Sequence, residues 1–164
     1  MTFCGIDPGL DGCLAVIEET GQITFWDVPT LESVPGRREY DLPAIVDLLL
    51  GLPVGDILVG IEKVHAMPKN GSIANFSMGV SFGMWTALLT AAEIPFEIVL
   101  PTRWKKLLMA DQGKTKDASR QVAMRLFPQA AAMLNLKKHH NRADAQLIAE
   151  YMRRTHGRKE RSDG

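Results

Sequence analysis

The sequence has few of the cysteines that cross-link small secreted domains, and it has no apolar run long enough to anchor a protein in a membrane. Its 164 residues include two cysteines, Cys4 and Cys13. Both fall within predicted strands and match neither a disulfide framework nor the spacing of a zinc site. No apolar run approaches the roughly 20 residues of a membrane span, and a strand begins so close to Met1 that no signal peptide fits before it. We therefore expect a cytoplasmic protein that starts at Met1, has reduced core cysteines and makes no membrane contact.

Acidic and basic residues are unevenly distributed along a chain whose net charge is zero. Residues 1–102 hold 4 Lys or Arg and 13 Asp or Glu, whereas residues 103–164 hold 15 and 6. A basic half beside an acidic half is expected of a protein that binds a polyanionic backbone and holds cations at a carboxylate cluster. Solvated helix faces are the simpler alternative.

The first part of the chain is predicted to form strands and one short helix. Apolar runs bounded by turn residues predict an antiparallel meander over residues 1–6, 13–17 and 22–28. Residues 29–40 are predicted to be a loop. Asp41 is the predicted N-cap of a short helix that Gly51 ends. The apolar run over residues 57–61 predicts a buried strand, which a crossover connection makes parallel to the first.

The rest of the chain is predicted to be mainly helical. A long helix over residues 73–92 follows a polar loop, with an apolar stripe made of Phe76, Val80, Ala87, Leu88 and Ala91. Gly79 and Gly83 on this helix allow close approach either to the sheet or to a second copy of the chain. After a last strand over residues 96–100, Thr102 is expected to cap the next helix.

Three further helical stretches are expected near the end of the chain. They cover residues 118–127, the segment from Pro128 to Leu136, and a final helix that Asn141 would cap. We expect one domain over residues 1–153, followed by a basic, flexible tail over residues 154–164.

Three carboxylates fall where elements of the predicted fold begin or end. Asp7 ends the first strand within Gly5-Ile6-Asp7-Pro8-Gly9, and Glu62 ends the buried strand Ile57–Ile61. Parallel strands bring these two acids to the same edge of the sheet. Asp144 lies at the start of the final helix. Oxygen ligands from separated elements are what a pair of hard Mg²⁺ ions needs.

Two of the three acids, Asp7 and Asp144, also have a purely structural interpretation. Asp7 can cap the tight turn that follows it by accepting a backbone N–H two residues on. Asp144 can close a capping box, if Asn141 is the N-cap. The ordered set of a strand Asp, a strand Glu and a helix Asp favours a site over three unrelated caps.

The ordered acids follow the ribonuclease H-like plan, and their surroundings resemble the RuvC-type Holliday-junction resolvases, including members of a phage or prophage type. The resemblance rests on Gly5-Ile6-Asp7-Pro8-Gly9 with Gly12, on Val59-Gly60-Ile61-Glu62 and on Arg142-Ala143-Asp144-Ala145. It covers roughly residues 2–153. It implies an α/β fold with a five-stranded mixed sheet, three antiparallel strands then two parallel ones, flanked by helices.

The resemblance also implies an activity. It makes the protein a homodimeric endonuclease that resolves four-way DNA junctions by symmetric, metal-dependent hydrolysis in DNA recombination and repair. Asp7, Glu62 and Asp144 would be catalytic acids that bind two Mg²⁺ ions, for which Mn²⁺ substitutes. DNA contacts are expected from His65, Lys69, Lys106, Lys114 and Lys116.

Two positions depart from the family pattern. The loop after Glu62 carries His65 and Met67 where the family often has an aromatic residue that stacks on bases. A fourth acid commonly lies three residues before the last one, and Asn141 occupies that position here. His140 lies four residues before Asp144, so both can face one side of a helix that starts early enough. We expect His140 to be the fourth catalytic and metal-binding residue, with a phosphate-contacting histidine as the alternative.

Other functions are compatible with parts of this pattern. Gly113-Lys114-Thr115 lacks the leading glycine and the preceding strand of a P-loop. An actin-like or sugar-kinase ATPase has a similar Asp-containing loop, but binds nucleotide between two domains and so needs a longer chain. A catalytically inactive DNA-binding module, in which Asn141 marks a lost site, is the main alternative. Cleavage of a synthetic junction separates it from an enzyme.

Overall fold

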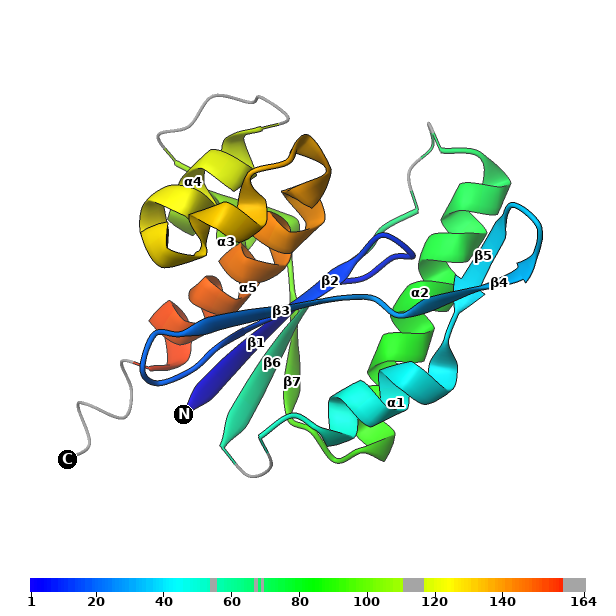
Figure 1. Cartoon of the computed structure of the whole chain (residues 1–164), viewed down its shortest axis with the longest axis horizontal. Helices are drawn as coiled ribbons and strands as arrows, with labels where there is room; N and C mark the ends of the chain where they lie inside the picture. Colours follow the sequence, from blue (N-terminus) through cyan, green and yellow to red (C-terminus); the bar gives the residue numbers. More distant parts are fainter. Residues whose placement is uncertain (54–55, 67, 69, 111–116, 158–164) are drawn as a thin grey trace.

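A five-stranded sheet lies between two groups of helices (Figure 1). The computed structural model describes residues 1–53, 56–66, 68, 70–110 and 117–157. The strand order is β3-β2-β1-β6-β7, with bounds β1 (Thr2–Asp7), β2 (Cys13–Ile17), β3 (Ile23–Asp27), β6 (Ile57–Glu62) and β7 (Phe96–Val99). β2 is antiparallel to β1 and β3, whereas β6 is parallel to β1 and β7 to β6. The expected sheet of three antiparallel and two parallel strands is confirmed.

Each face of the sheet has its own helices and its own apolar core. α1 (Leu42–Leu50) and α2 (Ser72–Ala91) cover one face. The other carries α3 (Pro101–Leu108), α4 (Ala118–Leu126) and α5 (His140–His156), with the 3₁₀ helices η1 (Pro128–Leu134) and η2 (Lys137–His139) before α5. Alternate residues of β1 enter different cores: Cys4 and Ile6 face α1 and α2, whereas Phe3 packs with the α5 side.

Two glycines let α5 press directly on the sheet. Gly5 and Gly60 are partners in the β1–β6 register. A Cβ atom on Gly5 would lie 2.0 Å from the carbonyl oxygen of Ala145, and one on Gly60 would lie 2.6 Å from Met152 Cγ. Only glycine fits at Gly5, because the obstructing atoms there belong to the backbone of α5.

The segment predicted as a loop over residues 29–40 is a β-hairpin. β4 (Thr30–Val34) and β5 (Arg37–Tyr40) form a separate two-stranded sheet, which extends beside α2 (Figure 1). Gly36 adopts φ of 79° at the tip. The loop prediction is wrong because Pro35 and Gly36 form the turn of this hairpin, and a proline and a glycine in sequence are equally typical of irregular structure.

Helix starts were predicted with mixed success. Asp41 caps α1 as expected, because its carboxylate accepts a hydrogen bond from the N–H of Ala44 at 3.1 Å. Thr102 does not cap α3, which begins one residue earlier at Pro101, the position where a proline is well tolerated. Asn141 does not cap α5, because the helix already starts at His140.

α2 buries a different face from the predicted stripe. Ser81, Trp85 and Leu89 are its buried residues, whereas Phe76 is 75% exposed and Val80 47% exposed. Apolar and small residues occur all around this helix, so hydrophobic spacing alone did not select the buried side. Nothing lies within 4 Å of a Cβ built on Gly79 or Gly83, so these glycines do not serve packing on the sheet.

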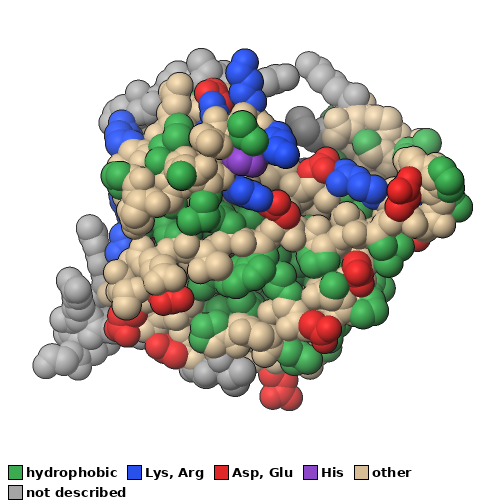
Figure 2. All heavy atoms as spheres, viewed as in Figure 1, with side chains coloured by type: hydrophobic (Ala, Val, Ile, Leu, Met, Phe, Trp, Pro, Cys, Tyr) green, Lys and Arg blue, Asp and Glu red, His purple; other side chains and the backbone are tan. Residues whose placement is uncertain are grey.

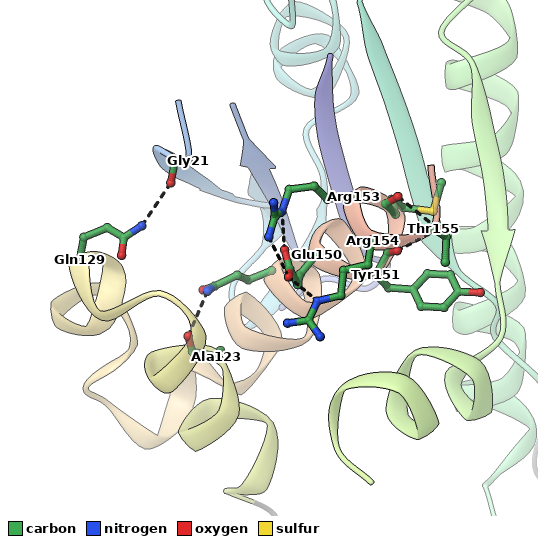
Figure 3. Close-up of polar contacts among 10 residues, drawn as sticks. Gly21, Ala123, Gln129, Glu150, Tyr151, Arg153, Arg154 and Thr155 are labelled. Atoms are coloured by element: carbon green, nitrogen blue, oxygen red, sulfur yellow. Dashed lines mark hydrogen bonds and ion pairs between the residues drawn. The ribbon is translucent and has the colours of Figure 1, made fainter. Parts of the chain in front are cut away.

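The C-terminal part of α5 contains a buried acid with two arginine partners. Glu150 is 1% exposed and is paired with Arg153 at 2.7 Å and Arg154 at 2.6 Å (Figure 3). α5 continues to His156, past the expected start of the tail at residue 154. Within the described residues, no helix is both long enough and apolar enough to cross a membrane.

Candidate active site

Two of the predicted acids reach one site because of strand alternation. Gly5 and Gly60 face α5, so Asp7 and Glu62, two residues further along β1 and β6, face the same side. The register pairs Ile6 with Ile61, which brings the two acids to the same edge. The turn after Asp7 is tight: a Cβ on Gly12 would lie 2.2 Å from the carbonyl oxygen of Asp7.

Asp144 joins them from the first turns of α5. Ala145, the next residue, is the one that rests against Gly5. One carboxylate oxygen of Asp144, Oδ1, is buried and has no hydrogen-bond partner among the described residues. A buried carboxylate oxygen without a partner costs free energy in the isolated protein, and a bound cation would remove that cost.

Burial raises the pKa of all three acids, and neighbouring acids raise the pKa of Asp7 and Glu62 further. Burial raises the pKa of Asp7 well above its usual range, and the charges of Glu62 and Asp144 raise it further. Burial also raises the pKa of Glu62 and of Asp144. Like charges brought together out of water favour protonation unless a cation is present. Among the described residues, the side chain of Asp7 accepts no hydrogen bond from the turn that follows it, so Asp7 does not cap that turn.

α3 supplies two residues that sequence reasoning did not single out. Nε1 of Trp104 donates a hydrogen bond of 2.9 Å to Oε1 of Glu62, and this bond lowers the pKa of that acid. Nζ of Lys105 lies 4.9 Å from the centroid of the Trp104 ring. The charge of Lys105 lowers the pKa of all three acids. Lys105 is thus the lysine of α3 whose charge acts on the acids, whereas its neighbour Lys106 stays a predicted DNA contact.

His140 and Asn141, neighbours at the start of α5, make different contacts. His140 is exposed, its Nδ1 lies 3.4 Å from the carbonyl oxygen of Lys137, and its charge lowers the pKa of Asp144. The side-chain amide of Asn141 donates to the carbonyl oxygen of Asp11, in the turn after β1. His140 therefore lies close enough to influence the acid, whereas Asn141 ties α5 to the turn.

The predicted DNA-contacting residues are only partly described. His65 and Lys106 are exposed. Lys69, Lys114 and Lys116 lie outside the described residues, as does Met67. Figure 2 shows lysine and arginine side chains gathered over the part of the surface that α3, α4 and α5 form, with acidic side chains mainly elsewhere.

The acids suit divalent cations without forming a closed cage. Over the described ranges, no group of three or more Asp, Glu, His or Cys side chains is gathered closely enough to hold one ion. The buried, unpartnered Oδ1 of Asp144 and the mutual repulsion of the acids nevertheless fit hard cations that bind through carboxylate oxygens. Asp7, Glu62 and Asp144 are the residues that could hold them.

Comparison with solved structures identifies this architecture. A structure of Thermus thermophilus RuvC in complex with a Holliday junction substrate matches with a TM-score of 0.59, over 95% of this chain and 97% of that chain, at 19% identity. The chain has the fold of RuvC. A second Thermus thermophilus RuvC structure matches with a TM-score of 0.55 over 94% of this chain and 96% of that one, also at 19% identity. The RuvC fold expected from the ordered acids is confirmed.

A curated relative adds similarity in sequence. The chain is 38% identical over 91 residues to the chloroplastic Holliday junction resolvase MOC1 of Chlamydomonas reinhardtii. The match covers 56% of this chain but 10% of that protein's length. No protein-family model matches the chain.

Proposed function

We propose that the protein is a structure-selective endonuclease that resolves four-way DNA junctions by metal-dependent hydrolysis. The observation that carries this proposal is the group of three half-buried acids, with raised pKa values and an unpartnered Asp144 oxygen, at one edge of a RuvC-like sheet. Both the RuvC structure and the MOC1 name refer to Holliday junctions, and the lysine and arginine side chains gathered on one part of the surface (Figure 2) suit a phosphate backbone.

The chain's own residues divide the work of the proposed reaction. Asp7, Glu62 and Asp144 would hold two Mg²⁺ ions, with Mn²⁺ as a substitute and His140 as the fourth ligand. Bound divalent ions activate a water molecule and stabilise the leaving oxygen of the phosphodiester. Lys105 adds positive charge beside the acids and favours their ionised form.

A homodimer is part of the proposal, because resolving a junction requires two cuts and each chain has one site. α2 offers the surface for it. Ile73 is 85% exposed and Phe76 75% exposed, and they lie on the same side as Val80, next to two glycines whose surroundings are open. Phe76→Asp should shift the protein to monomer in light scattering, whereas the same change at exposed Ile98 of β7 should leave a dimer.

A digest of a synthetic four-way junction tests the proposed function. Wild-type protein should nick two opposing strands symmetrically with Mg²⁺ or Mn²⁺, and should not cut in EDTA. Asp144→Asn is the matched loss-of-charge variant and should bind the junction without cutting it. Salt-sensitive binding without any cleavage by the wild type would instead identify an inactive DNA-binding module.

The lysines give a second test of the proposed DNA surface. Alanine at Lys106 or Lys116 should reduce the slope of log affinity against log salt by about 0.9 for each lost phosphate contact on duplex arms. Arg37 of the β4–β5 hairpin, which pairs with Glu39, is a control for the loss of one positive charge. An unchanged affinity and slope in both lysine variants would place the DNA elsewhere.

A further inference from the structure

Trp104 makes a contact that its place in the core does not require. The ring is fully buried among Val99, Leu108 and residues of α4 and α5. Its N–H points out of this apolar surrounding to Oε1 of Glu62, a residue 42 positions earlier in the chain. A buried indole N–H normally needs a partner, and here that partner is a proposed metal ligand.

A second buried tryptophan shows that this fold can bury an indole without such a contact. Trp85 of α2 is also fully buried, and its Nε1 has no hydrogen-bond partner. Packing alone therefore does not account for the direction of the Trp104 N–H. The two residues form a natural pair for comparison, because they share size, burial and chemistry but differ in this one bond.

An indole N–H is well suited to hold a carboxylate that must later bind a cation. It donates one hydrogen bond, carries no charge and does not titrate with the acids. An arginine in its place would neutralise Glu62 and compete with a cation for both oxygens. Trp104 engages one oxygen, so Oε2 is the oxygen of Glu62 that the indole leaves free.

The indole is itself held in place. Pro101 opens α3 with its fixed φ, and the ring lies in the core between this helix and α5. Lys105 lies over the ring, at 4.9 Å from its centroid. Glu62, at the end of β6, is only partly buried. The Trp104 indole is thus more tightly packed than the Glu62 carboxylate to which it donates.

We propose that Trp104 is a positioning residue that fixes the orientation of the Glu62 carboxylate for cation binding. This inference rests on the proposed function, in which Glu62 holds a divalent ion. Removing a residue that hydrogen-bonds to a metal ligand typically lowers metal affinity or activity by about 10- to 100-fold.

Trp104→Phe is the direct test, because it keeps an aromatic ring and removes the N–H. Mn²⁺ binding to DNA-free protein, followed by electron paramagnetic resonance of the free ion, should weaken by about 10- to 100-fold. Trp85→Phe is the matched control and should bind Mn²⁺ like the wild type. Equal Mn²⁺ affinity in wild type and Trp104→Phe would overturn the inference. A wild type that binds no Mn²⁺ would overturn the proposed function and this inference with it.

A second measurement leaves Trp104 in place, in case Trp104→Phe fails to fold. The three tryptophans give three indole N–H resonances in a ¹⁵N spectrum. The Trp104 resonance should move on adding Mg²⁺ and in Glu62→Gln, whereas the Trp85 resonance should not. A Trp104 resonance that responds to neither change would overturn the inference, even if the protein cuts junctions.

Discussion

Two acids on α5, the buried Glu150 and the half-buried Asp144, have opposite surroundings. Glu150 lies against the guanidinium groups of Arg153 and Arg154, and its charge is fully matched (Figure 3). Asp144, less than two turns earlier, has an unpartnered oxygen and faces two further acids. Its partial compensation comes from Lys105, His140 and the hydroxyl of Ser119.

The contrast distinguishes an acid that supports the fold, Glu150, from an acid that is available to a ligand, Asp144. A buried carboxylate that only supports the structure is stabilised by partners within the chain. A carboxylate that must bind a cation has to remain available, so its burial lowers the stability of the ligand-free protein. The same helix uses both arrangements.

Removing charge at the site should have the largest effect on activity. Asp7→Asn or Glu62→Gln should reduce junction cleavage by at least about 1000-fold, since metal-held acids contribute several kcal/mol to the transition state. Gel-shift affinity and circular dichroism should stay close to wild type. Near wild-type cleavage in Mg²⁺ by either variant would show that the site is wrongly assigned.

The matching change at Glu150 should act on stability. Glu150→Gln leaves two arginines without their partner and should lower the free energy of unfolding by about 1–3 kcal/mol, less than a fully buried pair because both arginines remain partly hydrated. Urea unfolding measures this loss. Asp144→Asn, measured in EDTA, should show no such loss, and cleavage per folded molecule of Glu150→Gln should equal wild type.

The neighbours His140 and Asn141 sharpen the comparison at the start of α5. If His140 is the fourth ligand, His140→Ala should reduce cleavage by about 10- to 100-fold, and His140→Asp should shift the preference from Mn²⁺ toward Mg²⁺. Asn141→Ala should mainly cost about 1 kcal/mol of stability, because its amide bonds the Asp11 carbonyl. Full activity in His140→Ala with loss in Asn141→Ala would reverse this assignment.

The smallest expected effect is the pH dependence of stability in EDTA. Because the folded-state pKa values of Asp7, Glu62 and Asp144 are raised, the folded protein holds protons that the unfolded chain has released. These acids therefore stabilise the fold most below about pH 4 and lose that contribution as pH rises through their folded values. The melting temperature should fall between pH 5 and 7.5, less steeply in Asp7→Asn. Mg²⁺ should make the melting temperature of the wild type depend less on pH. Equal slopes of melting temperature against pH for wild type and Asp7→Asn in EDTA would contradict this account.

Apolar runs bounded by turn residues were sufficient to predict the sheet. Asp7 and Glu62 could be placed at one edge because each ends an apolar strand, and a crossover makes those strands parallel. The hairpin over residues 30–40 was missed, since most of its side chains are exposed and show no buried alternation. The buried face of α2 was missed because its exposed face is apolar too.

The site was predicted as a set of acids, and their catalytic and metal-binding roles stay predictions. Its supporting residues were not found. Trp104 lies 42 positions from Glu62, and a tryptophan in a helix is ordinarily read as core. Lys105 and Lys106 are adjacent and chemically identical. Which of them influences the acids depends on how α3 is oriented about its own axis, and the sequence does not give that orientation.

Gly5 has a consequence for how the site tolerates change. Backbone atoms of α5 meet the backbone of β1 there with no side chain between them, so the separation of the Asp7 strand from the Asp144 helix does not depend on any rotamer. Core side chains elsewhere can be exchanged, at some cost in stability, without altering that separation. A core substitution can therefore lower the stability of this protein without changing the distance between the strand that carries Asp7 and the helix that carries Asp144.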